Sequence, residues 1–300
     1  MKSPGVVVCA SDTLEYIPDP TKSFPLVDII LFAHHSTITI AKQHGVYVLK
    51  NNRLWRVLQK PNEDELRANE ALFLNETQSE HTDVASGKQC EKLNREELAL
   101  TDSFYIISMN IADSLIKLLH KTSVTIECET CCYGDYLRPL GESPLWDYLQ
   151  CSDERLALAR KTFADLFRGK TTEVVQLPRN SFFHFGTIPE LLNHFAVASV
   201  FLNRFQITDP HKCLYSVLDG SQIEIGEKSI VEFCEFNRGA KIGNSCLISS
   251  CSSDRYVVLP DGICLTTIIL NQDQTRLSSA KIRLWNFASS NAEPKSVTVA

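Results

Sequence analysis

The chain has 300 residues, a formal net charge of −6 and 44% hydrophobic residues. This length allows one large domain or two ordinary ones, and the apolar content is enough for a hydrophobic core. The acidic balance gives no electrostatic reason to expect a nucleic acid or an anionic membrane as partner. No apolar run reaches the length of a bilayer span, and the N-terminus lacks a charged-then-apolar signal pattern.

Eleven cysteines occur in the chain. A secreted disulfide scaffold would be shorter, with few other core residues, so reduced core thiols are the favoured interpretation. Cys128, Cys131 and Cys132 resemble part of a zinc knuckle. The other close pair, Cys246 and Cys251, lies in a distant segment without Cys-x-x-Cys spacing, which disfavours a zinc site.

The first element has the sequence Gly-Val-Val-Val-Cys-Ala-Ser-Asp, from residue 5 to residue 12. The valine run predicts a fully buried parallel strand from Val6 to Cys9, with Asp12 at the carboxyl edge where open α/β sheets bind ligands. Such a strand is normally an inner one that follows a first βα unit, and only four residues precede this one. We therefore expect a chain that lacks its front end; the alternative is an unusual edge strand.

Strand-like and helix-like patterns alternate through the first two thirds of the chain. The predicted strands are Val6 to Cys9, Ile29 to Phe32, Gly45 to Leu49, Leu54 to Gln59 and Leu100 to Ile107. The predicted helices are Pro61 to Leu74, Ile111 to Leu119, Leu156 to Phe167 and Pro189 to Phe201, the last with Thr187 as its N-cap. The polar stretch 79–94 predicts a loop or insertion. This order predicts an α/β domain over residues 1–209.

After about residue 210 the helical patterns vanish and apolar residues recur every six positions. They are Leu218, Ile230, Phe236, Ile242 and Ile248. A six-residue period is typical of a parallel β-helix, whereas a β-meander would show period two. Glu224 breaks the register. About three coils are recognisable, so we expect the segment 210–300 to pack on the first domain or on a second copy of itself.

Three acidic residues are candidates for metal or sugar binding. Asp12, at the end of a strand, could hold Mg²⁺ against nucleotide phosphates, although a helix cap or turn acid is the alternative. Glu129 and Asp135 flank the segment Glu-Thr-Cys-Cys-Tyr-Gly-Asp. A second carboxylate there could complete a metal site or orient a sugar; the alternative is a turn acid around Gly134.

A glycine and a lysine mark two further strand ends. Gly45 opens the run Gly-Val-Tyr-Val-Leu, and Lys60 closes the run Leu-Gln-Lys-Pro. A glycine suits a backbone that must approach a ligand. A lysine at a strand end can present its ammonium to a phosphate, although many such lysines are solvated loop residues.

The motifs occur in an order that resembles one family. They are Val-Cys-Ala-Ser-Asp, His-Gly-Val-Tyr-Val-Leu, Leu-Gln-Lys-Pro, Thr-Asp-Ser-Phe-Tyr, Tyr-Gly-Asp-Tyr-Leu, Asn-Ser-Phe-Phe-His-Phe-Gly-Thr and Ser-Cys-Leu-Ile-Ser. From about residue 5 to residue 270, the series resembles the fucose-1-phosphate guanylyltransferase (GDP-L-fucose pyrophosphorylase) family, which is related to the pyrophosphorylase portion of bifunctional fucokinases. The resemblance implies a partial nucleotidyltransferase (Rossmann-like) α/β domain followed by a short left-handed parallel β-helix.

The same resemblance implies a reaction and its cofactor. The family joins GTP and β-L-fucose 1-phosphate into GDP-L-fucose, releasing pyrophosphate, with Mg²⁺. It implies that Asp12 and Lys60 act in catalysis, that Asp12 binds the metal and that Asp135 is a second metal ligand.

Substrate-binding residues and departures follow from the resemblance as well. It places Gly45, with Lys60, at the sugar phosphate and Asp102 and Glu129 near the sugar hydroxyls, and it makes His184 structural. The family carries a Gly-rich triphosphate loop upstream of the first strand, whereas no Gly-x-Gly or Gly-Gly occurs in this sequence. Where members can carry an Asp, two positions after Glu129, this chain has Cys131.

Our leading hypothesis is therefore a truncated or alternatively spliced cytoplasmic member of this family, with impaired GTP binding. One alternative is a catalytically inactive subunit that binds an active partner through its β-helix. Another is an incomplete gene product without independent function. An apolar, unpaired N-terminal strand edge would favour an oligomer or a covering partner.

Overall fold

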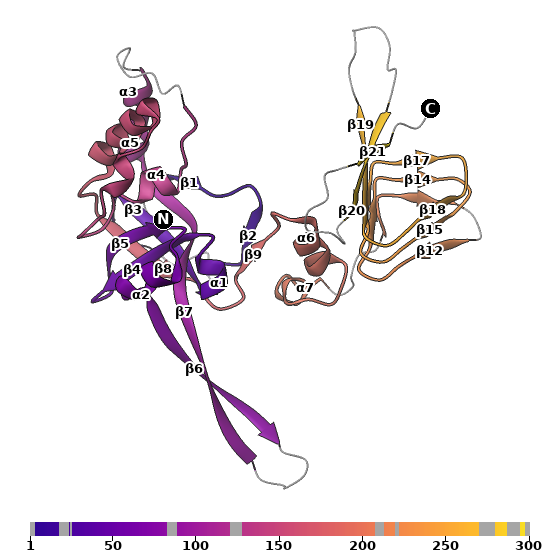
Figure 1. Ribbon diagram of the computed structural model, residues 1–300, viewed down its shortest axis with the longest axis horizontal. Helices are drawn as coiled ribbons and strands as arrows, with labels where there is room; N and C mark the ends of the chain where they lie inside the picture. The colour runs from indigo at the N-terminus through magenta and orange to yellow at the C-terminus, as the bar shows by residue number, and fades with distance from the viewer. Residues whose placement is uncertain are drawn as a thin grey trace. The chain divides into compact units, whose positions relative to one another are not determined.

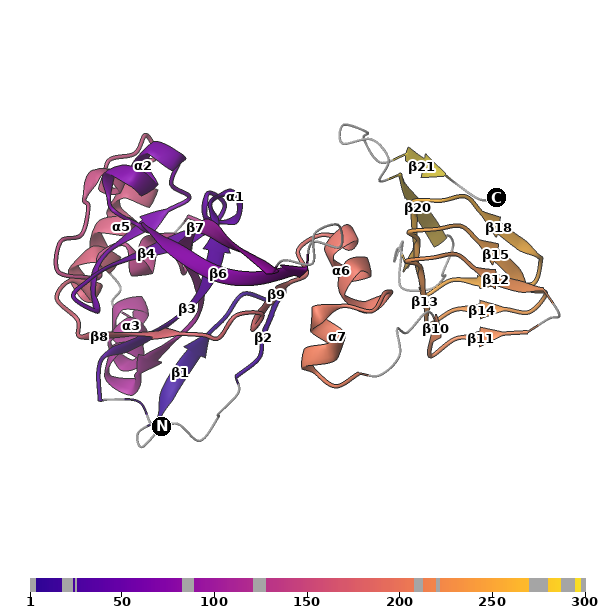
Figure 2. The ribbon, with the colours of Figure 1, turned by 90° about the horizontal axis from the view of Figure 1, so that it is seen from below.

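A computed structural model describes residues 4–17, 24, 26–82, 89–120, 128–207, 213–219, 222–269, 280–286 and 295–297. The chain forms two compact units (Figures 1 and 2). The first comprises Met1–Ser11 and Ile17–Phe182, and the second comprises Asp12–Tyr16 and Phe183–Ala300.

A mixed β-sheet forms the centre of the first unit. Its main path runs β5 (Arg53–Gln59), β4 (Gly45–Lys50), β7 (Gln89–Ser108), β3 (Ile29–Thr37) and β8 (Thr172–Gln176). β3 and β8 are parallel, whereas the other neighbours on this path are antiparallel. The predicted α/β class is confirmed, with a mixed sheet at its centre.

The strand β7 is much longer than predicted and forms a hairpin with β6 (Leu72–Thr82). The two strands form a ribbon that extends beyond the rest of the sheet (Figure 1). The loop predicted over residues 79–94 is therefore wrong for residues 79–82 and 89–94, which pair across the ribbon. The alternation that marks a strand in sequence arises where one face of a sheet is buried, and the polar stretch 79–94 does not show it.

The strand β1 (Gly5–Val8) corrects the interpretation of the valine run. It is antiparallel to β7, not parallel, and β7 is the strand with which it pairs. Val6 and Val7 are 40% and 55% exposed, so β1 is not a buried inner strand. β-Branched residues suit edge strands as well as central ones, and the valines alone do not determine the number of neighbouring strands.

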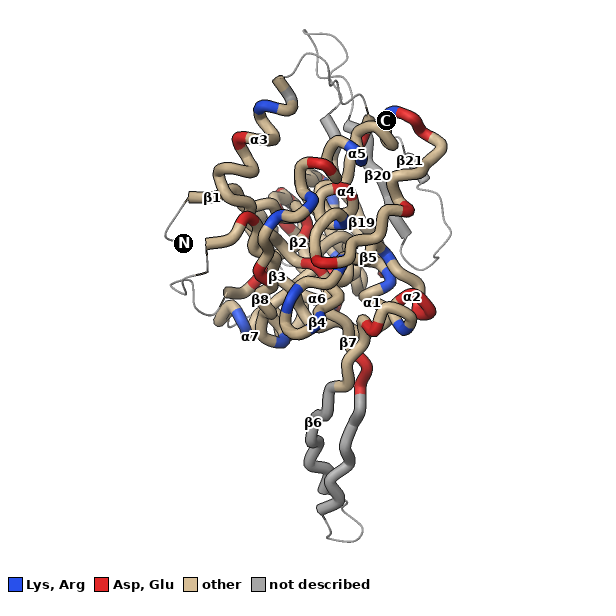
Figure 3. Tube along the Cα trace, turned by 90° about the vertical axis from the view of Figure 1, so that its left-hand side faces the viewer, with Lys and Arg blue, Asp and Glu red and all other residues tan. Residues whose placement is uncertain are grey.

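Helices cover the sheet of the first unit. They are α1 (Ile38–Ala41), α2 (Glu63–Ala68), α3 (Met109–His120), α4 (Gly134–Leu137) and α5 (Glu154–Phe167), with a 3₁₀ turn at Asp147–Leu149. The helices predicted from Ile111 to Leu119 and from Leu156 to Phe167 are confirmed as α3 and α5. The helix predicted to reach Leu74 ends at Ala68, because the chain joins the sheet as β6 from Leu72. α2 begins with three acidic residues and has a basic residue, Arg67, in its last turn (Figure 3), where Arg67 pairs with Glu63.

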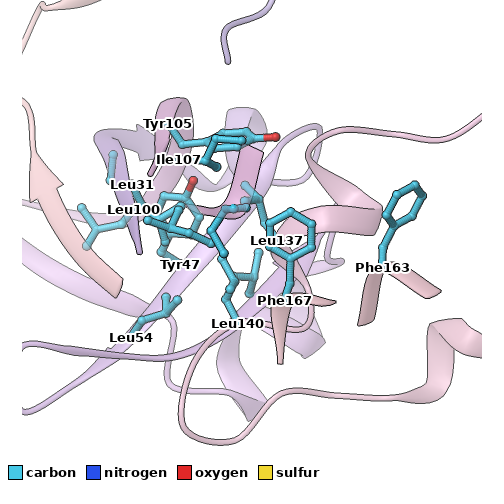
Figure 4. Close-up of a cluster of buried hydrophobic side chains, with 14 of the residues drawn as sticks. Leu31, Tyr47, Leu54, Leu100, Tyr105, Ile107, Leu137, Leu140, Phe163 and Phe167 are labelled. Carbon is cyan, nitrogen blue, oxygen red and sulfur yellow. The ribbon is translucent and has the colours of Figure 1, made fainter. Parts of the chain in front are cut away.

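The main core lies between the sheet and the segment from α4 to α5 (Figure 4). Its labelled members from the strands are Leu31, Tyr47, Leu54, Leu100, Tyr105 and Ile107, and those from the helical segment are Leu137, Leu140, Phe163 and Phe167. Burial of these large side chains provides the main driving force for packing the helices on the sheet.

The second unit begins with a short β-ladder and two helices. β2 (Thr13–Glu15) pairs with β9 (Phe182–His184). The helix predicted from Pro189 to Phe201 is instead two helices, α6 (Ile188–Phe195) and α7 (Val200–Arg204). Thr187 caps α6 as predicted, in a capping box, and Ser199 caps α7, so a second cap divides the predicted helix.

A parallel β-solenoid of about three turns follows, as predicted. Its three sheets are β10 (Cys213–Leu214), β13 (Ile230–Glu232), β16 (Leu247–Ser249) and β19 (Ile263–Ile269); β11 (Val217–Leu218), β14 (Glu235–Phe236) and β17 (Ser252–Ser253); and β12 (Ile223–Ile225), β15 (Ala240–Ile242) and β18 (Val257–Leu259). β20 (Ala280–Asn286) extends the sheet that contains β19 and is antiparallel to it, and β21 (Lys295–Val297) pairs antiparallel with β20.

The solenoid repeat is not a strict hexapeptide. Adjacent coils between β13 and β16 stack 17 residues apart, so Ile248 lies beside Val231 in the interior. Ile230 was predicted to be an interior residue, but it packs on the other side with Leu192 of α6. Leu218, Phe236, Ile242 and Ile248 do line the interior as predicted. Glu224 forms an ion pair with Lys241 of the next coil at 3.0 Å.

Candidate functional site

Gly45, the first residue of β4, is in direct contact with Asp102, which lies within the neighbouring strand β7. The pairing of Val46 with Thr101 brings Gly45 beside Asp102, and the N–H of Gly45 donates to Oδ1 of Asp102 at 3.1 Å. A Cβ on Gly45 would lie 2.9 Å from Cγ of Asp102 and still closer to Oδ2. The approach of this carboxyl group therefore requires a residue without a side chain at position 45.

A β-bulge follows Asp102 along β7. The register between β3 and β7 changes between Leu31 and Ala33, which pair with Tyr105 and Asp102 respectively, so β7 carries one extra residue there. Bulges re-aim side chains and are frequent beside active sites. Asp102 is 7% exposed, and this burial raises the pKa of its carboxyl group to about 7. The Gly45 N–H and the positive charge of Lys60 lower that pKa and limit the shift.

Lys60 lies at the end of β5 in a strained conformation. Its φ is +47°, a left-handed value that is uncommon for a residue with a side chain. Its N–H donates to the carbonyl of His44 at 2.9 Å, which ties it to the residue before Gly45. The lysine is exposed and the following Pro61 is buried. The structure thus brings together Lys60, Gly45 and Asp102, three of the predicted site residues.

Two histidines beside these residues were missed by the sequence analysis. Nδ1 of His44 lies 3.9 Å from Oδ1 of Asp102. The His34 ring stacks on Phe182 with 3.8 Å between centroids, and its Nε2 is 2.8 Å from the hydroxyl of Thr101. Burial, followed by the charge of His44, lowers the pKa of His34 to about 3, so this ring is neutral near pH 7. The adjacency of His44 to Gly45 was the one available signal in the sequence.

Glu129 and Asp135 lie in the segment around α4 but have different surroundings. Glu129 is exposed in the loop before the helix. Asp135 is buried: its Oδ1 accepts from Nε of Arg160 at 2.7 Å, and its Oδ2 accepts from the N–H of Cys131 at 2.8 Å. Both carboxylate oxygens of Asp135 therefore have partners in the protein, and its role as a metal ligand stays a prediction.

Asp12 belongs to the second unit, where it faces a histidine. Oδ2 of Asp12 is 3.4 Å from Nε2 of His184, and Nδ1 of the same ring is 3.1 Å from Oε1 of Glu190. Glu190 also accepts from the N–H and hydroxyl of Thr187, so the α6 capping box orients it. Gly186 packs on the imidazole so closely that a Cβ would meet the ring and Asp12. His184 thus links two carboxylates, whereas the sequence suggested a structural role alone.

The residues around Asp12 determine whether a Mg²⁺ ion could bind there. This ion takes one or two protein carboxylates together with phosphate oxygens and water. The Asp12 side chain is 47% exposed, so a phosphate-bound ion could reach it. In the parts of the chain that the structure describes, no three His, Cys, Asp or Glu side chains group as ligands of one metal. The residues fit an ion carried largely by its substrate, not one caged by protein.

Comparison with known proteins gives one family and two curated relatives. Residues 1–296 match the family described as "Fucose pyrophosphorylase domain". A mouse protein named fucose-1-phosphate guanylyltransferase is 23% identical over 290 residues, which cover 85% of this chain and 49% of the relative. The human protein of that name is 24% identical over 281 residues, covering 82% and 46%. The chain thus spans about half the length of these relatives. Among the described residues, no helix is long and apolar enough to cross a membrane.

Proposed function

Because the chain belongs to the fucose pyrophosphorylase family, we propose that it is a sugar-1-phosphate nucleotidyltransferase that joins GTP and L-fucose 1-phosphate into GDP-L-fucose and pyrophosphate. The observation that carries this proposal is the convergence of Lys60, which follows β5, and Gly45, which begins β4, with Asp102 of β7. A cytoplasmic location is part of the proposal. It is supported by ten of the eleven cysteines, which are free thiols, as is usual in reducing compartments.

In the proposed reaction, a phosphate oxygen of fucose 1-phosphate attacks the α-phosphorus of GTP in line. The new P–O bond forms as the bond to the β-phosphate oxygen breaks, and pyrophosphate leaves. Such transfers depend mainly on positioning and charge neutralisation. Lys60 supplies a cation at the sugar phosphate, and Gly45 lies beside it and leaves room for the Asp102 carboxyl group. Asp102 faces the sugar and is held in place by the Gly45 N–H.

Mg²⁺ is part of the proposal, and Asp12 is the residue we assign to it. The ion, when bound, neutralises charge on the transferring and departing phosphates. Asp12 contributes one accessible carboxylate, and the chain from Thr187 through Glu190 to His184 holds that carboxylate in place. Asp135 is a weaker candidate for a second ligand, because Arg160 already balances its charge.

The experiment is a product assay combined with a binding assay on the purified chain. GTP, L-fucose 1-phosphate and Mg²⁺ are mixed with the chain, GDP-L-fucose is measured by chromatography, and binding of each substrate is measured by calorimetry. Lys60→Ala should raise the KM for fucose 1-phosphate about tenfold or more by removing the cation. Asp12→Asn should abolish the Mg²⁺-dependent turnover.

Lys161→Ala is the matched control, because Lys161 is an exposed lysine on α5. It should behave as the unaltered chain in both assays. Binding of fucose 1-phosphate without product would favour the alternative of an inactive subunit or fragment. The absence of both product and substrate binding would refute the proposed function.

A further inference from the structure

Gln59 has an unpaired polar atom within the cluster around Gly45. Its Oε1 is buried and has no hydrogen-bond partner. Gln59 pairs with Gly45 across β5 and β4, so its side chain lies on the same face of the sheet as the Gly45–Asp102 contact. Buried amide oxygens nearly always have a partner, so an unpaired one needs an explanation, such as an absent ligand.

Because Gly45 has no side chain, two acceptor oxygens from neighbouring strands can lie close to it. A Cβ built on Gly45 would lie 3.3 Å from Oε1 of Gln59 and in contact with Oδ2 of Asp102. The amide oxygen of Gln59 and the carboxyl group of Asp102 thus both lie against the side of Gly45 that a side chain would occupy. Two converging acceptors call for a ligand with hydroxyl or ammonium donors.

Gln59 is also held from its other side by α4. A Cβ on Gly134, the first residue of that helix, would lie 3.3 Å from Cδ and 3.4 Å from Cγ of Gln59. The Gln59 side chain is therefore confined between two glycines from different elements. Side chains that are packed in this way lose little rotamer freedom on binding and are suited to recognising a ligand.

The adjacent Lys60 narrows the class of ligand. Lys60 is exposed, and its charge acts on the Asp102 carboxyl group. Lys60 therefore offers a cation for a phosphate, and the residue before it, Gln59, offers with Asp102 acceptors for hydroxyl groups. A phosphate joined to a polyhydroxylated ring combines these features.

We propose that Gln59 is a specificity-determining residue that accepts a hydrogen bond from a hydroxyl group of the sugar phosphate, with Asp102 as the second acceptor. This inference rests on the proposed function, because it assigns a task within the same site. It extends that function by assigning sugar discrimination to the residue before the phosphate-binding lysine. The sequence motif alone did not single out Gln59.

The test measures binding by titration calorimetry and compares Gln59→Met with the unaltered chain. Methionine keeps the length of the side chain and removes the carbonyl. The ligands are L-fucose 1-phosphate, its monodeoxy analogues and inorganic phosphate. We expect Gln59→Met to weaken the binding of fucose 1-phosphate on the order of 10- to 100-fold, since it removes one hydrogen bond to a desolvated hydroxyl. The affinity of Gln59→Met for inorganic phosphate should be within about twofold of the affinity of the unaltered chain.

The monodeoxy analogues identify the sugar hydroxyl group that Gln59 recognises. The analogue that lacks this hydroxyl group should bind the unaltered chain and Gln59→Met with equal affinity, since neither complex can form the hydrogen bond at position 59. Gln59→Glu keeps an acceptor oxygen and should retain the preference for the hydroxylated sugar. The matched control is Tyr148→Phe, which removes another buried unpaired oxygen of the first unit, outside this cluster. It should leave all affinities unchanged.

The outcomes separate the inference from the function on which it rests. Equal affinities of Gln59→Met and the unaltered chain for fucose 1-phosphate would overturn the inference and leave the proposed function in place. A chain that prefers another hexose 1-phosphate, with the same loss in Gln59→Met, would support the inference and correct the sugar. A chain that binds no sugar phosphate would overturn both.

Discussion

The N–H of Gly45 donates to the Asp102 carboxyl group at 3.1 Å, and the carboxyl group occupies the space that a side chain at position 45 would need. This contact joins the first residue of β4 to the position on β7 that precedes a bulge. The backbone thereby holds Asp102 in place, and Lys60 follows from the next strand along the chain.

The first prediction concerns Gly45→Ala. The added methyl group would collide with the Asp102 carboxyl group and force β4 and β7 apart at this point. Overpacking of this kind is expected to reduce the free energy of unfolding by about 1–3 kcal/mol. Chemical denaturation measures this loss, and calorimetry should show that fucose 1-phosphate binding falls with it.

Gly169→Ala is the comparison for that variant. Gly169 has a φ of +70° and nothing within 4 Å of a built Cβ, so alanine there should cost about 1 kcal/mol through backbone strain alone. It should leave ligand binding intact. Equal binding by Gly45→Ala and the unaltered chain would show that the close approach has no part in the site.

The second prediction is a pH dependence carried by Asp102. Its folded pKa of about 7 lies above the ordinary value of 3.8, so the folded state binds this proton more tightly than the unfolded state does. The stabilisation is complete below about pH 4 and is lost as the pH rises through 7, by on the order of 4 kcal/mol. Asp102→Asn should remove this dependence while keeping an acceptor for the Gly45 N–H.

His34 acts in the opposite direction. Its folded pKa of about 3 lies below the ordinary 6.5, so its contribution is present above pH 6.5 and is lost as the pH falls toward 3. The two groups partly compensate between pH 4 and 6.5 in the unaltered chain. The difference in unfolding free energy between the unaltered chain and Asp102→Asn, measured from pH 4 to 8, isolates Asp102. A difference that does not change with pH would contradict the assigned pKa.

Much of the site's local composition was predictable, whereas its three-dimensional connections were not. Gly45 and Lys60 were chosen because a glycine at a strand start and a lysine at a strand end have recognisable chemistry. Their proximity to Asp102 depends on the order of β5, β4 and β7 and on a bulge, and neither leaves a periodic signal. Gln59 was overlooked because burial of its amide oxygen depends on Gly134, which is remote in sequence.

The fold shows the same limits. The six-residue spacing correctly predicted a solenoid, but Ile230 was assigned to the interior because a strict period places it in line with Ile248. The 17-residue coil shifts that register by one, and a shift of one residue moves a side chain to the opposite face. The valine run of β1 predicted a strand correctly but said nothing about its neighbours.

The third prediction concerns the stacked glycines of the solenoid. A Cβ on Gly243 would lie 2.5 Å from N of Asp261 and 2.6 Å from C of Pro260 in the next coil. Because backbone atoms of a stacked coil cannot move as a flexible side chain can, Gly243→Ala should destabilise the second unit by about 3 kcal/mol or more. Ser252→Ala, at an exposed solenoid position, should change stability by less than about 0.5 kcal/mol. Similar melting curves for both variants would mean that the coils can separate at this turn.

The fourth prediction separates two roles for Asp135. Its side chain is 4% exposed and that of Arg160 is 22% exposed, so Asp135→Asn would leave a largely buried guanidinium without its counter-charge. Loss of one partner of a buried pair costs about 3–5 kcal/mol. If Asp135 has the structural role, denaturation should show this loss equally with and without Mg²⁺.

Asp147→Asn is the comparison: that carboxylate is 73% exposed and 3.6 Å from Arg138, so its removal should cost less than about 1 kcal/mol. A loss in Asp135→Asn that appears only when Mg²⁺ is present would instead make Asp135 a metal ligand and leave Arg160 as its positioning residue.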